Sequence, residues 1–484
     1  MYQDKQAPPL LDRERILIWI ALAGVILRIL LLSYGTLTFG QQEFLSIYGD
    51  TPGYLESASN LVAGRGYSVD YFGILYPETS RPPGYPALIG ASLFLFRNTL
   101  PLVTLQIILS GIIPILGYLV ISHIFRKRIA ALTSAAFLAF EPLVVILSTV
   151  LLTETIFMAT FLGALALFFS GLSPERKNRA IILGASGILF AYAALVRPVG
   201  LYMLPIAALY GFYHLWKEAA LTPKEIAVSL VIFITASVLP VSAWMSRNKL
   251  VADSFALTSL TGVVSYFRLG VSVIAVERGA EYGPVRQELR AKAKRDIGGE
   301  LRDARNASYY QRQTLAIIKE HPSAFAKLMA LGAFHLFTHD GYFDAAKRIV
   351  PNLEAPQSAA QITLLARGEF SRFVEVAKRF LAWPWIIFVA ARILWILVFF
   401  SALYGSAVLW IKKILPKSSL VFTFVLIASL TLPALTLGLG IEGRIRLPAN
   451  IFILTLAFYG WSHLMSLFRS RLHSLPPRIS RALT

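Results

Sequence analysis

The side chains best suited to chemistry in this chain are carboxylates and arginines at the ends of apolar segments. The first polar stretch, Tyr48–Pro86, contains Asp50 before a predicted helix and Arg81 ahead of two prolines, which fix the backbone there. Arginines can clamp a phosphate, and a carboxylate can take a proton from an incoming hydroxyl. These residue types would suit a reaction on a phosphate-bearing substrate, with Asp50 as the candidate base.

Later segment ends carry the same residue types. Glu154 begins the apolar run within TVLLTETIF, and Arg197 precedes a proline at another boundary. Near the C-terminus, the segment Glu442–Arg446 contains Arg444 and Arg446. In an extended backbone these two arginines would share one side, because side chains alternate with a period of two.

Each of these residues also has a structural interpretation. Asp50 could cap the helix that follows it, because an acid at a helix start is favourable in any case. Glu154 could form a structural ion pair, and Arg197 could reach the lipid headgroups by snorkelling. Arg444 and Arg446 could be ordinary surface charges. The sequence leaves these alternatives open.

A histidine pair forms a separate candidate. His335, His339 and Asp340 give an HxxxHD pattern, which could place two imidazoles on one helix face for a metal ion. No third ligand is identifiable, so polar packing is the favoured interpretation and we predict no cofactor. Walker, Rossmann, HExxH and GxSxG motifs are also absent, which argues against nucleotide-dependent and serine-hydrolase chemistry.

Membrane helices must position these side chains. The chain has 484 residues, of which 56% are hydrophobic and 15% charged, with a mean hydropathy of +0.62. Soluble domains carry about 25% charged residues. Repeated apolar stretches of about 20 residues indicate helices that cross the hydrocarbon. The fold class predicted is an all-α polytopic membrane protein.

The charge balance agrees with that class. The net charge is +19, from 46 Lys and Arg against 27 Asp and Glu. A soluble protein with this excess would suggest nucleic acid, but here much of it lies in short loops and the C-terminal tail, as the positive-inside rule requires. We predict no nucleic-acid partner. Cysteine is absent, which excludes disulfides, a thiolate nucleophile and Cys-ligated metal.

We predict ten membrane spans and two helices that are too short to cross the membrane. A three-turn amphipathic helix from Thr51 to Val62 and the apolar stretch Tyr85–Phe96 are assigned to the membrane interface. The ten predicted spans are Ile16–Leu37, Pro101–Phe125, Ile129–Thr149, Thr155–Gly171, Ala180–Val196, Val199–Trp216, Ile226–Ser246, Trp385–Ile411, Ser418–Leu439 and Leu447–Phe468.

These ten spans divide the polar segments between the two sides of the membrane. Both termini and the short basic loops fall on the cytoplasmic side of the cell (inner) membrane. Asp50, Arg81, Glu154, Arg197 and the segment Glu442–Arg446 all fall on the extracytoplasmic side, where we expect the active site.

Four parts follow along the chain. An N-terminal transmembrane catalytic module covers 1–248 and contains a first external loop, 38–100. A small extracytoplasmic helical segment covers 249–381. C-terminal transmembrane helices occupy 382–468, and a basic cytoplasmic tail covers 469–484.

These motifs together resemble the C-type glycosyltransferases (GT-C). Within them they resemble the bacterial family 39-like branch related to protein O-mannosyltransferases and the lipid A aminoarabinose transferase. The likeness covers the N-terminal part of the chain and, near its end, GRIRLP. The positions that carry it are Asp50, Tyr54, Ala58, Leu61, Gly64, Gly66 and Tyr67, then RPPGYP, LLTETIF and LVRPVGL.

The resemblance implies a polyprenyl-phosphate-linked sugar donor, interfacial helices in the first external loop and inversion at the anomeric carbon. By position, Asp50 matches the first-loop acid assigned to acceptor activation, and Glu154 the acid of the second external loop. Arg81 matches the basic residue before the proline turn, and Arg197 a basic position near the donor phosphate. The relatives' C-terminal soluble domain has no counterpart in this sequence, and no DxD surrounds Asp50, which fits a monophosphate donor handled by arginine.

We therefore predict a membrane glycosyltransferase, of the hexosyl or pentosyl kind, that transfers a sugar from polyprenyl phosphate to a hydroxyl of a lipid, glycan or protein. An oligosaccharide polymerase or ligase using a diphosphate-linked donor and a lipid or polysaccharide transporter are the alternatives. The predicted site comprises catalytic Asp50 and Glu154, phosphate-binding Arg81, Arg197, Arg444 and Arg446, and substrate-binding Tyr54, Tyr85 and Glu442.

Overall fold

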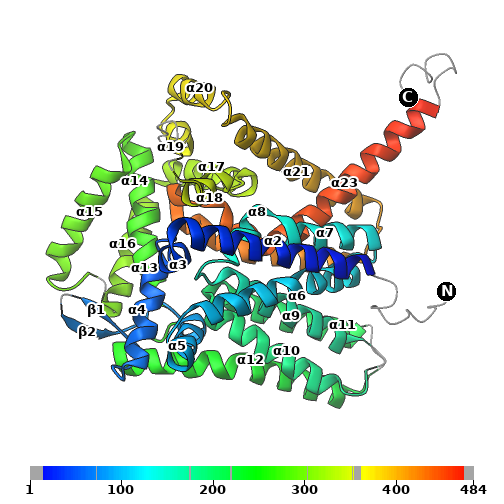
Figure 1. The fold of residues 1–484 in the computed structure, drawn as a ribbon, viewed down its shortest axis with the longest axis horizontal. Coiled ribbons are helices and arrows are strands. Elements are labelled where there is room, and N and C mark those ends of the chain that lie inside the picture. Colours follow the sequence, from blue (N-terminus) through cyan, green and yellow to red (C-terminus); the bar gives the residue numbers. More distant parts are fainter. Residues whose placement is uncertain are drawn as a thin grey trace.

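A computed structural model describes residues 15–473 except 72, 174, 175, 218–220, 302, 352 and 354–360. Most of the predicted basic tail, residues 474–484, lies outside the described residues. The described chain is almost wholly helical, with one two-stranded sheet (Figure 1).

Ten helical stretches in the described part of the chain are long and apolar enough to cross a membrane, which confirms the predicted multi-pass helical class. They are α2 (Arg15–Phe39), α6 (Leu100–Phe125), α9 (Glu154–Leu172), α10 (Arg179–Val196), η1 (Pro198–Tyr202) with α11 (Met203–Lys217), α12 (Pro223–Ala252), α13 (Leu260–Val264) through the π-helical turn η2 (Ser265–Gly270) to α14 (Val271–Arg278), α21 (Ile386–Ile411), α22 (Lys417–Thr431) with η4 (Leu432–Gly440), and η5 (Gly443–Arg446) with α23 (Leu447–His473).

The membership of this set differs from the prediction in two places. The predicted continuous span Ile129–Thr149 is wrong, because it breaks into α7 (Arg128–Phe140) and α8 (Pro142–Leu147). Pro142 cannot continue a helix, and the carboxylate of Glu141 accepts a hydrogen bond from Val144 N to begin the next one. Leu260–Arg278 was assigned to no span.

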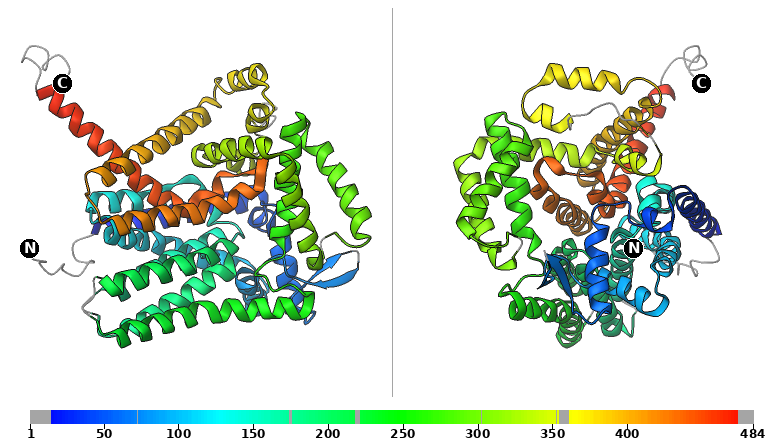
Figure 2. Two further views of the ribbon diagram at one scale, coloured as in Figure 1. Left: turned by 180° about the vertical axis from the view of Figure 1, so that it is seen from behind. Right: turned by 60° about the vertical axis from the view of Figure 1, so that its left-hand side comes forward.

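The views show how these helices are arranged. The helices α2, α6, α9, α10 and α12 run roughly side by side, whereas α13, α14 and α16 (Ala307–Glu320) run across one end of the bundle (Figures 1 and 2). Length and composition would allow Leu260–Arg278 to span, but its direction is crosswise to the long helices. α2 begins and α23 ends at the opposite end of the bundle.

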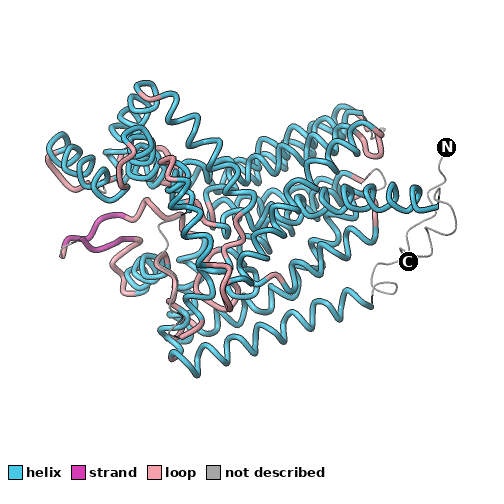
Figure 3. The backbone as a smooth tube through the Cα atoms, turned by 90° about the horizontal axis from the view of Figure 1, so that it is seen from above, coloured by secondary structure: helices cyan, strands magenta, loops and turns pink. Residues whose placement is uncertain are grey.

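The first loop gathers at the end covered by the crosswise helices. It contains α3 (Gln41–Leu45), α4 (Thr51–Val62), β1 (Ser68–Tyr71), β2 (Ile74–Pro77) and α5 (Gly84–Phe96). Both short helices form as predicted. The hairpin was not predicted; its strands pair antiparallel, and they project beyond the bundle in Figure 3.

The remaining helices connect the crosswise helices to α21. They are α15 (Tyr282–Ile297), η3 (Ala304–Asn306), α17 (Pro322–Thr338), α18 (Tyr342–Ile349), α19 (Gln361–Ala366) and α20 (Phe370–Arg379). The crosswise helices have an apolar core of their own, built around Tyr266, Leu289, Tyr310 and Leu328. The bundle has a separate and larger core, in which α9 is the most enclosed helix.

Candidate active site

Asp50 and Arg444 meet at the loop-covered end of the bundle. Arg444 Nη2 donates to Asp50 Oδ2 at 2.6 Å, although the two residues are 394 positions apart. Its Nε donates to Glu442 Oε2 at 2.6 Å, and its Nη1 lies 3.7 Å from Glu154 Oε1. One guanidinium therefore joins three carboxylates. The Asp50 side chain remains 51% exposed and can meet a ligand.

Glu154 and Arg197 extend this cluster into the bundle. Glu154 begins α9, and Arg197 follows the last residue of α10, so two helix ends bring them together. Arg197 Nη1 lies 2.8 Å from Glu154 Oε1, but the alignment does not make a hydrogen bond, and Nη1 is buried with no hydrogen-bond partner. Arg197 is thus held beside Glu154 by charge, and its Nη1 makes no hydrogen bond of its own.

Arg81 approaches from the turn after the hairpin. Its Nη1 donates to Glu78 Oε2 at 3.0 Å, and its guanidinium lies over the ring of Tyr54, 5.5 Å from the centroid. A Cβ on Gly53 would lie 2.2 Å from Cζ of Arg81. Gly53 therefore leaves the space in which this guanidinium crosses the first turn of α4, three residues from Asp50.

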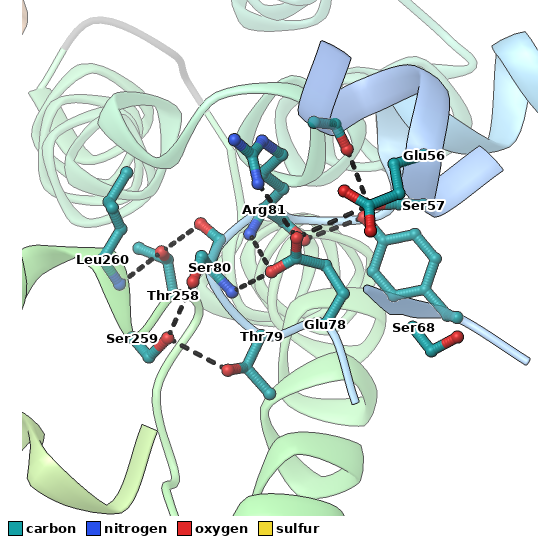
Figure 4. A network of polar contacts seen from close by, with 12 residues as sticks. Glu56, Ser57, Ser68, Glu78, Thr79, Ser80, Arg81, Thr258, Ser259 and Leu260 are labelled. Atoms are coloured by element: carbon teal, nitrogen blue, oxygen red, sulfur yellow. Dashed lines mark hydrogen bonds and ion pairs between the residues drawn. The ribbon is translucent and has the colours of Figure 1, made fainter. Parts of the chain in front are cut away.

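Glu78, which sequence reasoning missed, organises that turn (Figure 4). Its buried carboxylate accepts hydrogen bonds from the backbone N–H groups of Ser80, at 2.5 Å, and Arg81, at 3.2 Å. The turn is also joined to the chain after α12, because Ser259 N donates to Thr79 O and Thr258 Oγ1 donates to Ser80 O. The turn that carries Arg81 is thus fixed from both sides.

Arg247 and Tyr48 are further residues that the sequence motifs did not assign. Arg247 donates to the carbonyls of Glu78 and Tyr67, so it supports the loop. Tyr48 contacts two guanidinium groups, those of Arg348 at 4.6 Å and Arg444 at 5.6 Å from its ring centroid. Burial chiefly raises the pKa of Tyr48 to about 12, so the phenol stays neutral.

The three predicted substrate-binding residues differ in access. Glu442 is 47% exposed beside Asp50, so it is open to a ligand. Tyr54 packs edge-on against Tyr85 at 5.4 Å and carries Arg81 on its ring. Tyr85 is fully buried and donates to Gln106 Oε1 at 2.8 Å, which places it behind Tyr54.

Arg446 does not join the cluster. The segment containing it is a 3-10 turn, so the expectation that an extended backbone places Arg444 and Arg446 on one side is wrong. Arg446 is 1% exposed, and its donors are used by Asn450, Leu336 and His339. Phosphate has no free nitrogen to contact there.

The histidine pair lies beside Arg446. The rings of His335 and His339 are 4.5 Å apart, and Arg392 Nη2 lies 3.0 Å from Nδ1 of His335. Asp340 Oδ1 accepts from the backbone of Tyr342. Among the described residues, no group of three or more His, Cys, Asp or Glu side chains is placed to hold a metal ion. Burial lowers the pKa of His335 to about 3, which keeps it neutral.

The surroundings of Asp50 set its ionisation. Burial pushes the pKa of this carboxyl upward, but the charge and hydrogen bond of Arg444, with Arg197 and Arg81 beyond, outweigh burial and lower it below the ordinary value. Asp50 is therefore ionised and able to accept a proton. Its strong ion pair also makes it a weak base while Arg444 holds it.

A family comparison covers part of the segment that contains these residues. Residues 80–244 match the protein-family model described as dolichyl-phosphate-mannose-protein mannosyltransferase. The matched segment contains Arg81, Glu154 and Arg197. The match confirms the predicted relationship to the C-type glycosyltransferases and supports a glycosyltransferase-like membrane protein. Comparison with curated proteins gave no match.

The solved structures that match this chain share little sequence with it. The apo oligosaccharyltransferase of Archaeoglobus fulgidus is 15% identical, with a TM-score of 0.47 over 97% of this chain and 51% of that chain. AglB from the same organism, in complex with an inhibitory peptide and a dolichol-phosphate, is 12% identical, with a TM-score of 0.47 over 97% of this chain and 53% of that chain. ArnT from Cupriavidus metallidurans, bound to undecaprenyl phosphate, is 14% identical, with a TM-score of 0.35 over 95% of this chain and 81% of that chain. The chain spans about half the length of the two oligosaccharyltransferase chains.

Proposed function

We propose that the protein transfers a hexose or pentose from a polyprenyl-phosphate donor to a hydroxyl of a lipid, glycan or protein acceptor. Asp50 takes the proton of the hydroxyl, whose oxygen bonds to the anomeric carbon. The bond from that carbon to the phosphate oxygen breaks, and the phosphate leaves with the electron pair. A single displacement of this kind inverts the anomeric centre.

One observation carries the proposal. A half-exposed carboxylate, Asp50, lies in the same ion-pair cluster as Arg197, whose Nη1 is paired by charge with Glu154 and makes no hydrogen bond, and Arg444 joins the two through Glu154. A base and a phosphate contact are the two groups that this displacement needs. The matched family is named for a dolichyl-phosphate-linked mannose, a lipid monophosphate, which supports the donor class.

Arg444 has a double role in this scheme. Bound to Asp50, it lowers the basicity of that carboxylate. When the donor phosphate draws its N–H groups away, Asp50 loses its strongest partner, and its pKa rises toward the range of an effective base. Donor binding would then precede activation of the acceptor. Glu154 holds Arg197 and Arg444 for the leaving phosphate.

The orientation in the cell is part of the proposal. The connections Arg126–Arg128 and Lys412–Lys413 lie at the end of the bundle opposite the site, where α2 begins. Basic short loops favour the cytoplasm. We therefore place the site on the extracytoplasmic face of the inner membrane, with both termini cytoplasmic.

The test is a transfer assay with protein reconstituted in lipid, a panel of polyprenyl-phosphate sugars, and acceptor masses measured by mass spectrometry. The wild-type protein should form product from a monophosphate donor. Asp50→Asn should lower transfer by about 10²- to 10⁴-fold, the usual contribution of a general base. The matched control is Asp253→Asn, which changes an exposed acid that pairs with Lys249.

Two outcomes would count against the proposal. Full activity in Asp50→Asn would remove the base role from this residue. Product from diphosphate-linked donors alone would replace the donor class and favour a polymerase or ligase.

A further inference from the structure

Arg446 occupies a buried position that the proposed mechanism does not use. Its Nε donates to Asn450 Oδ1 at 2.8 Å, Nη1 to Leu336 O at 2.7 Å and Nη2 to His339 O at 3.1 Å. The guanidinium also lies over the ring of Trp395, 4.0 Å from its centroid. The protein itself therefore engages all three nitrogens.

Two of these bonds satisfy the C-terminal end of α17. The last carbonyls of a helix have no partner within it and carry partial negative charge. Arg446 supplies donors to Leu336 O, inside the last turn, and to His339 O, one residue past the end. Because Arg446 immediately precedes α23, it ties the end of α17 to the beginning of α23.

Gly443 forms a second tie to the same place. A Cβ at this position would lie 2.9 Å from the carbonyl carbon of Asp340 and 3.0 Å from the nitrogen of Gly341. These are backbone atoms, which cannot turn aside as a long side chain can. The start of η5 thus rests directly on the backbone that follows α17.

Arg444 lies between these two fixed positions. We propose that Arg446 is a positioning residue that, together with Gly443, holds η5 against the end of α17 so that Arg444 reaches Asp50 and Glu154. The role in transfer rests on the proposed function; the effect on Asp50 does not. The HxxxHD segment then serves as the structural support for a catalytic turn, since His339 accepts from Arg446 and Asp340 packs on Gly443.

The first variant is Arg446→Lys. Lysine keeps the charge but has one nitrogen in place of a planar fork, so it cannot bond Asn450, Leu336 and His339 in the same geometry. The turn should shift, and transfer should fall by about 10²-fold, as expected for a displacement of about 1 Å near reacting groups. The loss should appear in both kcat and the donor KM, because the displaced Arg444 is the group that meets the donor phosphate in the proposed mechanism.

A pH profile separates positioning from general destabilisation. Asp50 lies among the guanidinium groups of Arg444, Arg197 and Arg81, the phenol of Tyr54, and the carboxylates of Glu154 and Glu442 on the other nitrogens of Arg444. If Arg444 moves away, the acidic limb of the profile should shift to higher pH, as it should in Arg444→Gln. Combining Arg446→Lys with Arg444→Gln should shift the acidic limb little further than either variant does alone, because both act through Arg444.

The matched control is Arg28→Lys. Arg28 is also fully buried and donates to Ser148 and to backbone carbonyls, but it ties α2 to the α7–α8 break and does not contact η5. This variant should lose stability and leave the acidic limb unchanged. An equal shift in both variants, or none in Arg446→Lys, would overturn the inference.

A second measurement does not depend on transfer. Carbodiimide modifies protonated carboxyls, so labelling of Asp50, normalised to exposed Asp70 and read by mass spectrometry, follows its titration. Labelling should extend to higher pH in Arg446→Lys and in Gly443→Ala, the variant used if the first does not fold. A wild-type protein without transfer activity would sink the proposed function and leave this test valid; unchanged labelling in both variants would sink the inference.

Discussion

Two turns present an arginine to the same site, and they hold it by different means. In the turn 78–81, the side chain of Glu78 binds Arg81, and the guanidinium lies in the space left by Gly53. In the turn 443–446, Gly443 before Arg444 and Arg446 two residues after it contact the backbone that follows α17.

The difference teaches where each arginine is vulnerable. Arg81 is placed by contacts at the end of a flexible side chain, so it can be displaced while the fold survives. Arg444 is placed by the backbone of η5, so what displaces this turn also strains the packing of α17 against α23. Function and stability should separate in the first turn and change together in the second.

Among the variants of these two turns, the largest effect should come from Arg444→Gln, which removes the guanidinium shared by both halves of the site. Transfer should fall by about 10²- to 10³-fold, as for loss of one directed donor to a developing charge. Without Arg444, burial dominates the pKa of Asp50, so the pKa rises and the acidic limb of the kcat/KM profile moves to higher pH. An unshifted limb would show that Arg444 does not control Asp50.

A pair of glycine substitutions tests the comparison itself. In Gly53→Ala, the atoms nearest to the new methyl belong to the guanidinium of Arg81, which can swing aside. Transfer should fall roughly tenfold through misplacement, with the thermal midpoint unchanged. In Gly443→Ala, the methyl meets the backbone of Asp340, so both transfer and the midpoint should fall. Equal losses of stability in the two variants would contradict the distinction between the turns.

The smallest effect should come from Glu78→Gln. The amide oxygen can still accept from the backbone of Ser80 and Arg81, but the ion pair to the Arg81 guanidinium is lost. The loss should be about 1 kcal/mol, or roughly fivefold in transfer, the net value of one hydrogen bond. Glu78→Ala is the comparison variant, and it should cost more because it also removes the acceptor of the turn.

Much of the fold was predictable because apolar length and basic loops report directly on spans. The missed break at Glu141 was also readable, since an acid before Pro142 is a helix-start signal within an apolar run. The crosswise direction of Leu260–Arg278 was not, because length and hydropathy are the same for a helix that crosses a membrane and one that lies along it.

The site was predictable by residue type but not by direction. Asp50, Glu154, Arg197 and Arg444 come together as the shared boundary suggested. A 3-10 turn, which sequence alone could not distinguish from an extended segment, sends Arg446 the other way. Glu78 stood three residues before Arg81, a spacing that signals an ion pair only when the local backbone is known.

The joining of Ser259 and Thr258 to the turn at Thr79–Ser80 has a consequence for protein engineering (Figure 4). Residues 249–381 follow the matched family segment, and the crosswise helices within them have a core of their own. An engineer could therefore choose this segment for exchange with that of another protein. A graft cut at the end of α12 would remove the hydrogen-bond partners of the loop that carries Arg81. Chimaeras of this protein should therefore be joined after Leu260, so that Thr79 and Ser80 keep their hydrogen bonds to Thr258 and Ser259.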